Sequence, residues 1–181
     1  MHEKRYHGDG DRLRSPERIE RLEVPRVIAQ SMAGIELTSV LDVGTGTGLF
    51  AEEFSKVGLR VQGVDANPEM AAAAARHVPG AQFSVSTAEA LPFEDRSFDL
   101  VFMGLVFHET DDPLEALREA LRIASKRVAI LEWPHREQDY GPPIEHRVDP
   151  ETLRQHLSTL SAPAPRRMEL DSVDLYLIDK A

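Results

Sequence analysis

A short apolar run that ends in an acid and then turns through three glycines constrains this chain more than any other feature. It reads Val-Leu-Asp-Val-Gly-Thr-Gly-Thr-Gly-Leu-Phe over residues 40–50. Glycine permits a sharp turn and the close approach of a ligand, because it has no Cβ. A strand, a glycine-rich loop and a helix in this order form the nucleotide-binding opening of an open parallel α/β sheet. The segment therefore predicts a nucleotide-type ligand beside residues 44–48.

The details of this segment discriminate between nucleotides. The dinucleotide fingerprint G-x-G-x-x-G requires a third glycine at the position where this chain has Leu49. Asp42, at the end of the strand, would repel the pyrophosphate of a dinucleotide. S-adenosylmethionine has no phosphate, and it carries an ammonium and a sulfonium that a carboxylate attracts. The segment therefore favours S-adenosylmethionine over a nicotinamide dinucleotide.

Length and charge limit the other possibilities. The 181 residues suit a single domain, residues 1–181, with an N-terminal arm over residues 1–38 and a core over residues 39–181. The net charge of −10 disfavours a nucleic-acid partner, because phosphate binding needs a basic surface. The lack of cysteine excludes disulfides and cysteine-ligated metal. No segment has the apolar length of a membrane span and the N-terminus does not resemble a signal peptide, so we expect a cytoplasmic protein.

Strand and helix patterns alternate from residue 39 onward. Short apolar runs are typical of strands that are buried on both faces. Such runs cover Val40–Val43, Val61–Val64, Phe98–Phe102 and Val128–Leu131, and Gln82–Val85 is a weaker strand expected near an edge. Near the C-terminus, Arg167–Leu170 and Leu175–Ile178 are separated by a short polar turn, so they are expected to pair as an antiparallel hairpin.

Helix starts are marked by a capping side chain followed by proline at the first helical position. This device occurs at Ser15-Pro16, Asn67-Pro68, Asp112-Pro113 and Asp149-Pro150. Glu115 adds a capping-box partner for Asp112. Strands that alternate with helices predict a parallel sheet with helices on both faces.

Five sequence blocks stand in a characteristic order: Val40–Gly48, Val61–Asp65, Ala88–Phe93, Ser97–Val101 and Val128–Trp133. Together they resemble the motifs of class I S-adenosylmethionine-dependent methyltransferases, and are most similar to the small ubiquinone/menaquinone-biosynthesis group (methyltransferase type 11). The resemblance runs from residue 13 to the C-terminus. It implies a three-layer, Rossmann-like α/β sandwich with a seven-stranded, mostly parallel sheet whose last strand is antiparallel. It also implies methyl transfer from S-adenosylmethionine to a small-molecule acceptor, with S-adenosylhomocysteine as the product.

The resemblance assigns cofactor roles to individual positions. The glycine loop would pass against the methionine and ribose parts of the cofactor, and Asp42 would bind the ammonium side directly or through water. Asp65 would accept two hydrogen bonds from the ribose hydroxyls. Asp42 has an alternative role, because an acid at a strand end can cap the neighbouring turn. The implied cofactor-binding set is Asp42, Gly44, Thr45, Gly46, Gly48, Asp65, Ala66, Met70, Thr87, Ala88, Met103 and Gly104.

The chain departs from the family pattern at three places. Thr45 replaces a cysteine or small residue, which is a harmless change. Thr87 replaces an aspartate that accepts from the adenine amino group, and a neutral hydroxyl is the weaker acceptor. Ala124–Arg127 is shorter than the glycine-containing turn that precedes the fifth strand in the family, and we interpret it as a structural turn far from the site.

His108 and Glu109 form the titratable pair expected beside the reactive methyl group. One of them would act as a general base toward the acceptor. The alternative is that His108 only shapes the pocket wall by bonding to the backbone. Methyl transfer needs little acid–base help when the acceptor is an activated carbon, a thiolate or an amine, so positioning would then be the main catalytic effect.

Two further segments are expected to surround the acceptor. The proline-rich stretch Trp133–Arg147 follows a strand and would form one wall, with Trp133, Tyr140, His146 and Arg147 as the substrate-pocket residues. The N-terminal stretch Tyr6–Val24 would act as a lid over the cofactor, although its mixed charges also suit a solvated helix face. His2 and His7 are too loosely placed to indicate a metal site, and no metal is expected.

Two other functions remain open from the sequence. A nicotinamide oxidoreductase is disfavoured by Leu49 and Asp42. A protein that binds S-adenosylmethionine without catalysis, as a sensor or partner subunit, would retain the same cofactor motifs. The sequence indicates neither the acceptor atom nor the oligomeric state.

Overall fold

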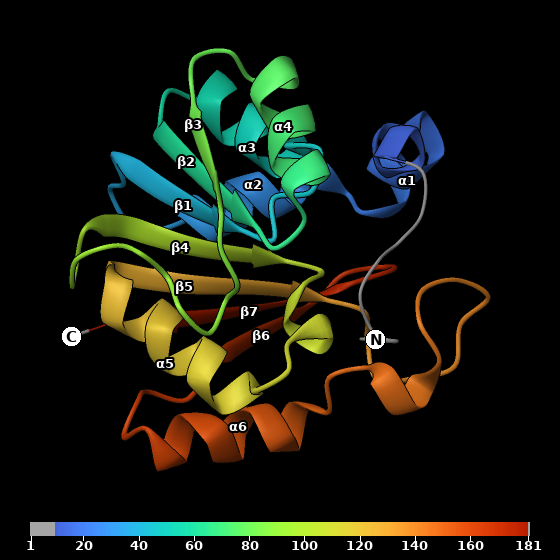
Figure 1. Cartoon of the computed structure of the whole chain (residues 1–181). Helices are drawn as coiled ribbons and strands as arrows, with labels where there is room; N and C mark the ends of the chain where they lie inside the picture. The colour runs from blue at the N-terminus through green and yellow to red at the C-terminus, as the bar shows by residue number, and fades with distance from the viewer. Residues whose placement is uncertain (1–9, 181) are drawn as a thin grey trace.

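A computed structural model describes residues 10–180, in which a seven-stranded sheet lies between two layers of helices (Figure 1). The strands follow the order β3-β2-β1-β4-β5-β7-β6 across the sheet. Only β7 runs antiparallel to its neighbours, β5 and β6, and every other pairing is parallel. This topology confirms the three-layer sandwich, the antiparallel last strand and the C-terminal hairpin. The strands are β1 (Ser39–Val43), β2 (Arg60–Asp65), β3 (Gln82–Val85), β4 (Phe98–Gly104), β5 (Ala124–Glu132), β6 (Arg166–Glu169) and β7 (Asp174–Asp179).

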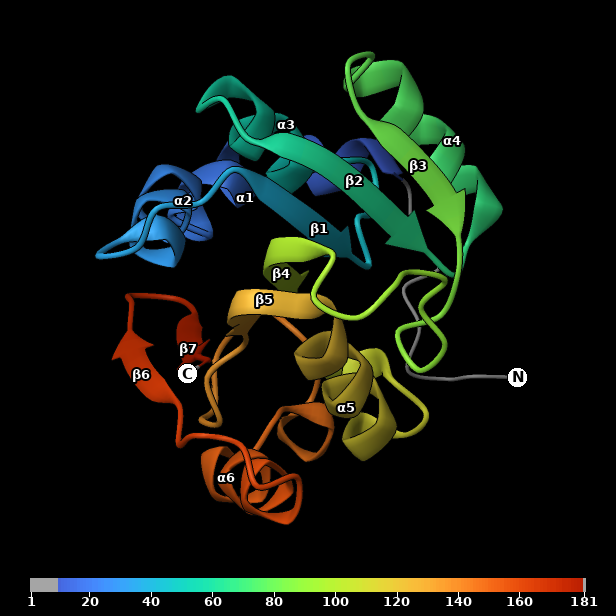
Figure 2. The same cartoon turned by 90° about the vertical axis from the view of Figure 1, so that its left-hand side faces the viewer.

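Figure 2 shows α3 and α4 on one side of the sheet and α5 and α6 on the other. All four capping side chains predicted from the sequence accept a backbone N–H at the start of their helices, as expected for Ser15, Asn67, Asp112 and Asp149. The helices on the first side are α1 (Pro16–Arg21), α2 (Val24–Met32), α3 (Leu49–Lys56) and α4 (Pro68–His77), preceded by the 3-10 turn η1 (Gly10–Arg14). The others are η2 (Phe107–Glu109), α5 (Pro113–Ile123), η3 (Ile144–His146) and α6 (Pro150–Thr159).

Two local predictions are wrong. Ala124–Arg127 is no turn, because β5 begins at Ala124 directly after α5. The buried Arg127 guanidinium donates from this strand to the carbonyls of Ser31 and Ala33, at 2.9 and 3.0 Å, and pairs with Asp179. The extended strand thus has its own stabilising contacts and needs no turn.

The capping box predicted at Asp112 is also incomplete, because the Glu115 carboxylate pairs with Arg118 instead of returning to the Asp112 N–H.

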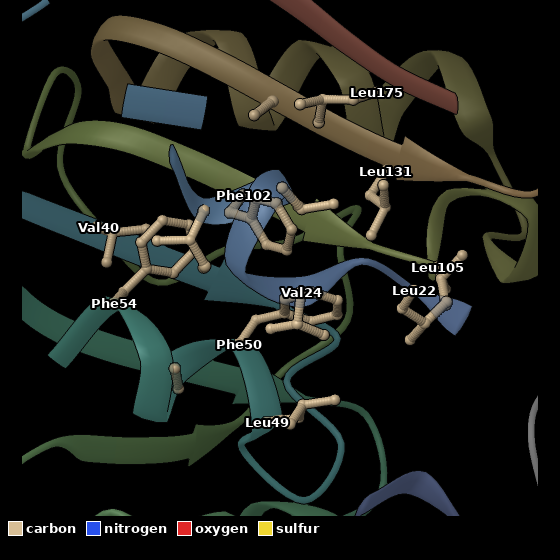
Figure 3. Close-up of a cluster of buried hydrophobic side chains, with 14 of the residues drawn as sticks. Leu22, Val24, Val40, Leu49, Phe50, Phe54, Phe102, Leu105, Leu131 and Leu175 are labelled. Atoms are coloured by element: carbon tan, nitrogen blue, oxygen red, sulfur yellow. The ribbon is translucent and has the colours of Figure 1, made fainter. Parts of the chain in front are cut away.

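Strand side chains alternate between two apolar cores, one on each face of the sheet. On β4, Phe102 faces α3 and the adjacent Met103 faces the α5 side. Figure 3 shows Phe50 and Phe54 of α3 directed toward Phe102, with ring centroids 4.9 and 5.2 Å from it. These aromatic contacts fix the helix that follows the glycine loop against the sheet. The loop is therefore held at the carboxyl end of β1.

The strand order reverses direction at β1, since β2 lies on one side of it and β4 on the other. In open parallel sheets, ligands bind in the crevice outside the carboxyl ends of strands at such a point. The loops after β1, β2 and β4 meet there, and these are the loops that carry the predicted cofactor residues. The candidate ligand site is therefore expected at this end of the sheet.

Candidate active site

A cavity of about 790 Å³ lies at the carboxyl ends of β1, β2 and β4. Its volume is within the range of pockets that hold a small-molecule ligand. Thirteen residues predicted from the sequence contribute to its wall. They are Gly44, Thr45, Gly46, Asp65, Ala66, Met70, Thr87, Ala88, Gly104, His108, Glu109, Trp133 and Tyr140. The fold thus brings together residues that are up to 96 positions apart in the chain.

The glycine loop needs its glycines for backbone geometry. Gly44 and Gly46 have φ values of +69° and +53°, in the left-handed region that other residues seldom adopt. A Cβ on Gly44 would also lie 2.3 Å from a methyl group of Val106, which follows β4. The loop after β1 and the loop after β4 therefore approach each other closely, and both line the cavity.

Asp65, the last residue of β2, joins two loops through its carboxylate. Oδ2 accepts from the backbone N–H of Gly46 at 2.8 Å, and Oδ1 accepts from that of Asn67 at 2.8 Å. A carboxylate has about four lone-pair sites and only accepts hydrogen bonds. Asp65 lines the cavity beside Ala66. Its geometry suits a ligand that offers hydroxyl donors.

Asp42 does not reach the cavity, contrary to the role that the resemblance implies. It is 1 % exposed, and its Oδ2 accepts from the Thr45 hydroxyl at 2.7 Å. Burial, aided by the nearby charge of Asp65, raises the pKa of Asp42 to about 7 against the opposing effect of the Thr45 hydrogen bond. The contact with Thr45 is the turn-capping alternative. Asp42 therefore supports the glycine loop from below.

Two other predicted cofactor residues also lie outside the wall. At Gly48 the start of α3 packs closely against α4. A Cβ on Gly48 would lie 3.2 Å from Cα of Ala74. Met103 is fully buried in the core on the α5 side of the sheet, on the face opposite to the side chain of Phe102. Gly48 thus serves helix packing, and Met103 serves the core.

His108 and Glu109 lie on η2, which directly follows β4, and both line the cavity. A residue that sequence reasoning missed, Glu132, lies behind them at the end of β5 and is fully buried. Its carboxylate accepts from the His108 ring Nδ1 at 2.8 Å and from the His108 backbone N–H at 3.1 Å. The available signal was an acid that ends an otherwise apolar strand, Val128–Leu131. Asp42 follows the same pattern, because it is an acid near the end of the apolar run over residues 40–43.

The segment Trp133–Arg147 contributes only part of its predicted residues to the wall. Trp133 and Tyr140 line the cavity, with ring centroids 5.7 Å apart, whereas His146 and Arg147 do not. The Arg147 side chain is turned into its own loop. Its guanidinium donates to four backbone carbonyls and one amide oxygen, those of Pro134, Arg136, Tyr140, Pro142 and Gln138. Arg147 therefore shapes the loop that carries the two aromatic rings.

Arg147→Ala is expected to lower the free energy of unfolding by about 1–2 kcal/mol, because several carbonyls lose a charged donor but regain water when the loop opens. The emission of Trp133, the only tryptophan of the chain, should shift to longer wavelength as its surroundings become more hydrated. Urea unfolding and fluorescence spectra measure the two effects. Arg154→Ala is the matched control, since the exposed Arg154 pairs with Glu151 on the surface of α6. Equal results for the two variants would contradict the role of Arg147.

The N-terminal arm covers the cavity beside these aromatic rings. Arg18 lies over the Trp133 ring at 5.9 Å and Arg21 over the Tyr140 ring at 4.7 Å, and both arginines line the cavity. Arg14 donates to the carbonyl of Thr47 at 3.1 Å and pairs with Glu52 of α3. These contacts attach η1 and α1 to the core at the position expected of a lid. The first part of the predicted lid, residues 6–9, and the two histidines His2 and His7 lie outside the described residues.

Cavity residues that sequence reasoning did not single out include Leu13, Ser86, Glu89 and Thr110. Glu89 accepts from the backbone N–H of Asp111 at 2.8 Å and so ties the loop after β3 to the start of α5. Within residues 10–180 no cluster of histidine and acidic side chains suits a metal ion. No helix in that range is long and apolar enough to cross a membrane.

The cavity wall fits an adenosine-type ligand with a slender substituent. Asp65 supplies an acceptor pair for hydroxyl groups, and the apolar side chains of Ala66 and Met70 lie next to it. The backbone of the glycine loop forms the adjoining wall without any side chain at Gly44 or Gly46. This combination of a diol acceptor, an apolar slot and a bare backbone is what a nucleoside with a slender substituent requires.

Comparison with known proteins agrees with this fold. A family described as "Methyltransferase domain" matches residues 41–131. The chain is 31 % identical over 119 residues to a demethylmenaquinone methyltransferase of Renibacterium salmoninarum, which covers 65 % of this chain and 49 % of that protein. It is 36 % identical over 104 residues to the enzyme of the same name from Chlorobaculum tepidum, covering 54 % and 43 %. The chain thus spans about half the length of the curated relatives it matches.

A solved structure covers nearly the whole chain. The crystal structure of a SAM dependent methyltransferase from Aquifex aeolicus superimposes with a TM-score of 0.84 at 26 % identity, and the match covers 95 % of this chain and 97 % of that one. The chain belongs to the class I S-adenosylmethionine-dependent methyltransferases. Its cofactor is accordingly S-adenosylmethionine, and the nicotinamide alternative is set aside.

Proposed function

We propose that the protein transfers the methyl group of S-adenosylmethionine to a small-molecule acceptor. The observation that carries this proposal is the composition of one continuous cavity. One part of its wall consists of the glycine loop and Asp65, and another consists of His108, Trp133 and Tyr140. A cofactor subsite and an acceptor subsite that share one cavity are what direct transfer between two ligands requires.

The residues on the cofactor side have separate roles in this proposal. Asp65 accepts the two ribose hydroxyls, and Ala66 and Met70 pack on the adenine. The backbone N–H of Ala88 and the hydroxyl of Thr87 bind the edge of the base. Bound S-adenosylmethionine supplies an activated methyl group on a sulfonium. The glycine loop from Gly44 to Gly46 holds the methionine part through its backbone.

The residues on the acceptor side support a small acceptor. The aromatic rings of Trp133 and Tyr140 are overlaid by Arg18 and Arg21 of α1, so the arm narrows this side of the cavity. A concave wall lined by aromatic rings suits a small molecule better than a protein or nucleic-acid segment. The names of the curated relatives suggest demethylmenaquinone as a first acceptor to test.

The test combines a binding measurement with a transfer measurement. S-adenosylhomocysteine is titrated into the full chain and followed by calorimetry and by the emission of Trp133, which lines the cavity. Methyl-labelled S-adenosylmethionine is then incubated with the protein and either demethylmenaquinone or a bacterial metabolite extract. We expect saturable binding and a labelled low-molecular-weight product.

Each result separates the proposal from its alternative. Binding without any labelled product in the extract would favour a sensor or partner subunit over an enzyme. A labelled macromolecule in place of a small product would overturn the acceptor class. Absence of binding would overturn the proposal as a whole.

A further inference from the structure

Glu132 and His108 form a buried carboxylate–imidazole pair at the wall of the cavity. The Glu132 side chain is 0 % exposed and that of His108 is 7 % exposed. Glu132 Oε2 lies 2.8 Å from His108 Nδ1 and 3.2 Å from the backbone nitrogen of Trp133, while Oε1 lies 3.1 Å from the backbone nitrogen of His108. The carboxylate is the acceptor in all three contacts. It therefore fixes both the ring and the backbone of His108.

We propose that Glu132 orients His108 so that the ring Nε2 takes a proton from the acceptor, which makes the acceptor a molecule with a weakly acidic O–H or N–H. This inference rests on the proposed function, because it concerns the acceptor side of the same cavity. Glu132 is a positioning residue in it, and His108 is the catalytic base. A carbon or thiolate acceptor without a proton to lose would have no use for the pair.

The hydrogen bond to Glu132 determines the tautomer of His108. An ionised carboxylate only accepts, so Nδ1 of the ring must carry the hydrogen. In the neutral imidazole, Nε2 is then the unprotonated nitrogen with a free lone pair. The nearest acid on that side is Glu109, whose Oε1 is 3.8 Å from Nε2, beyond hydrogen-bond distance. His108 lines the cavity, and the proposal assigns its proton-accepting Nε2 to the acceptor.

Several charged groups face this pair. Glu109 lies on the same turn as His108, Arg147 lies on the loop after β5, and Asp174 and Tyr176 lie on β7 beside Glu132. Burial by itself would lower the pKa of His108, but the charge and hydrogen bond of Glu132, aided by Glu109 and opposed by Arg147, raise it above the ordinary histidine value. Glu132 thus stabilises the imidazolium that forms when Nε2 takes a proton.

The transfer step balances with these groups alone and the methyl donor. The acceptor oxygen or nitrogen forms a bond to the methyl carbon, the bond between that carbon and sulfur breaks, and sulfur keeps the electron pair. The proton of the acceptor goes to Nε2 of His108. The imidazolium is neutralised by Glu132 and later loses its proton to water. No oxidant, reductant or metal takes part.

The first experiment follows the His108 ring by ¹⁵N NMR as a function of pH in the full chain, with His108→Gln used for assignment. We expect neutral wild-type His108 to carry its hydrogen on Nδ1. In Glu132→Gln the titration midpoint should fall by about one pH unit or more, because burial then acts without the opposing charge. Asp99→Asn is the matched control, since it removes a carboxylate at the opposite end of β4, and it should leave the midpoint unchanged.

The wild-type tautomer decides the proposal even if Glu132→Gln does not fold. A hydrogen on Nε2 of neutral His108 overturns it, and so does an equal midpoint in a folded Glu132→Gln variant. Neither result depends on methyl transfer, so failure of this inference is distinct from failure of the proposed function. Calorimetry with S-adenosylhomocysteine should give affinities within about twofold for wild type and Glu132→Gln, because Glu132 lies outside the cofactor side of the wall.

The second experiment uses the labelled product from the metabolite extract. The methyl group should reside on oxygen or nitrogen. The rate of label transfer should rise with pH through the raised pKa of His108, and in Glu132→Gln this rise should move to lower pH while the maximal rate falls at least about tenfold. A methyl group on sulfur, or a rise that does not move, overturns the proposal.

Discussion

Asp65→Ala is expected to weaken the binding of S-adenosylmethionine by about 1.5–3 kcal/mol, which is roughly a 10- to 150-fold increase in the dissociation constant. The variant removes a charged acceptor for two hydroxyl donors of the ligand. It also removes the contacts to the backbone N–H groups of Gly46 and Asn67, which lie at 2.8 Å from the two carboxylate oxygens. Both effects act on the cofactor side of the cavity. Calorimetric titration with S-adenosylmethionine measures the change.

Two further variants separate charge from loop geometry. Asp65→Asn retains one acceptor oxygen and should show an intermediate loss of affinity. Asp95→Ala removes an acid whose side chain is 74 % exposed and distant from the cavity wall, and should bind as wild type does. An Asp65→Ala variant that is folded, as judged by urea unfolding, and that binds with the wild-type dissociation constant would exclude Asp65 from the cofactor site.

The local sequence was sufficient to predict the architecture because each element carries its own physical signal. Residues 40–43 are buried on both faces, as their continuous apolar run predicts. Asn67 and Asp149 cap helices that begin with proline, and the close spacing of Arg167–Leu170 and Leu175–Ile178 required an antiparallel hairpin. The turn predicted at Ala124–Arg127 failed because strand pairing to β4 and β7 extends β5 back to the end of α5. That pairing is a tertiary effect.

The site could be predicted only where the backbone fixes the direction of a residue. Asp65 ends its strand and lies at the cavity, whereas Asp42 is followed by Val43 before the loop begins and points beneath the loop toward Thr45. The sequence shows that residue 42 is an acid, but it does not show to which face of the strand its side chain points. Glu132 and His108 are 24 positions apart, and only the pairing of β4 with β5 brings them together. A sequence scan for local motifs does not detect such a pair.

The loop after β5 illustrates the same limit. Proline and aromatic residues indicated a stiff wall, and Trp133 and Tyr140 do line the cavity. Arg147 was expected among them, because it belongs to the same proline-rich stretch after the strand. Its carbonyl partners, such as Pro134 and Pro142, converge on the guanidinium only once the loop has folded. The sequence therefore could not show which side chains of the loop line the cavity and which, like that of Arg147, bond within the loop itself.

Asp42→Asn is expected to stabilise the protein increasingly as the pH rises. Burial raises the pKa of Asp42 from 3.8 to about 7 in the folded state, whereas the unfolded chain has the ordinary value. Between these two pH values the folded state binds more protons than the unfolded state, so the free energy of unfolding declines with pH and levels off above pH 7. A shift of this size corresponds to at most about 4 kcal/mol. Asparagine carries no charge and still offers an oxygen to the Thr45 hydroxyl, so the variant should lack this decline.

Urea unfolding of wild type and Asp42→Asn at intervals between pH 4 and pH 8 measures the difference. The curves should be closest at pH 4 and should separate up to about pH 7. Asp99→Asn provides a control of opposite sign: burial acts to raise the pKa of Asp99, but its hydrogen bonds from Thr38, Lys126 and Ser125 outweigh burial and lower it. That variant should lose stability relative to wild type as the pH rises toward the ordinary aspartate value of 3.8, because the ionised form is the one that the fold favours. Its curves therefore extend below pH 4. A constant difference between wild type and Asp42→Asn from pH 4 to pH 8 would mean that Asp42 is ionised as easily in the fold as in water, and that burial beneath the glycine loop has no electrostatic cost.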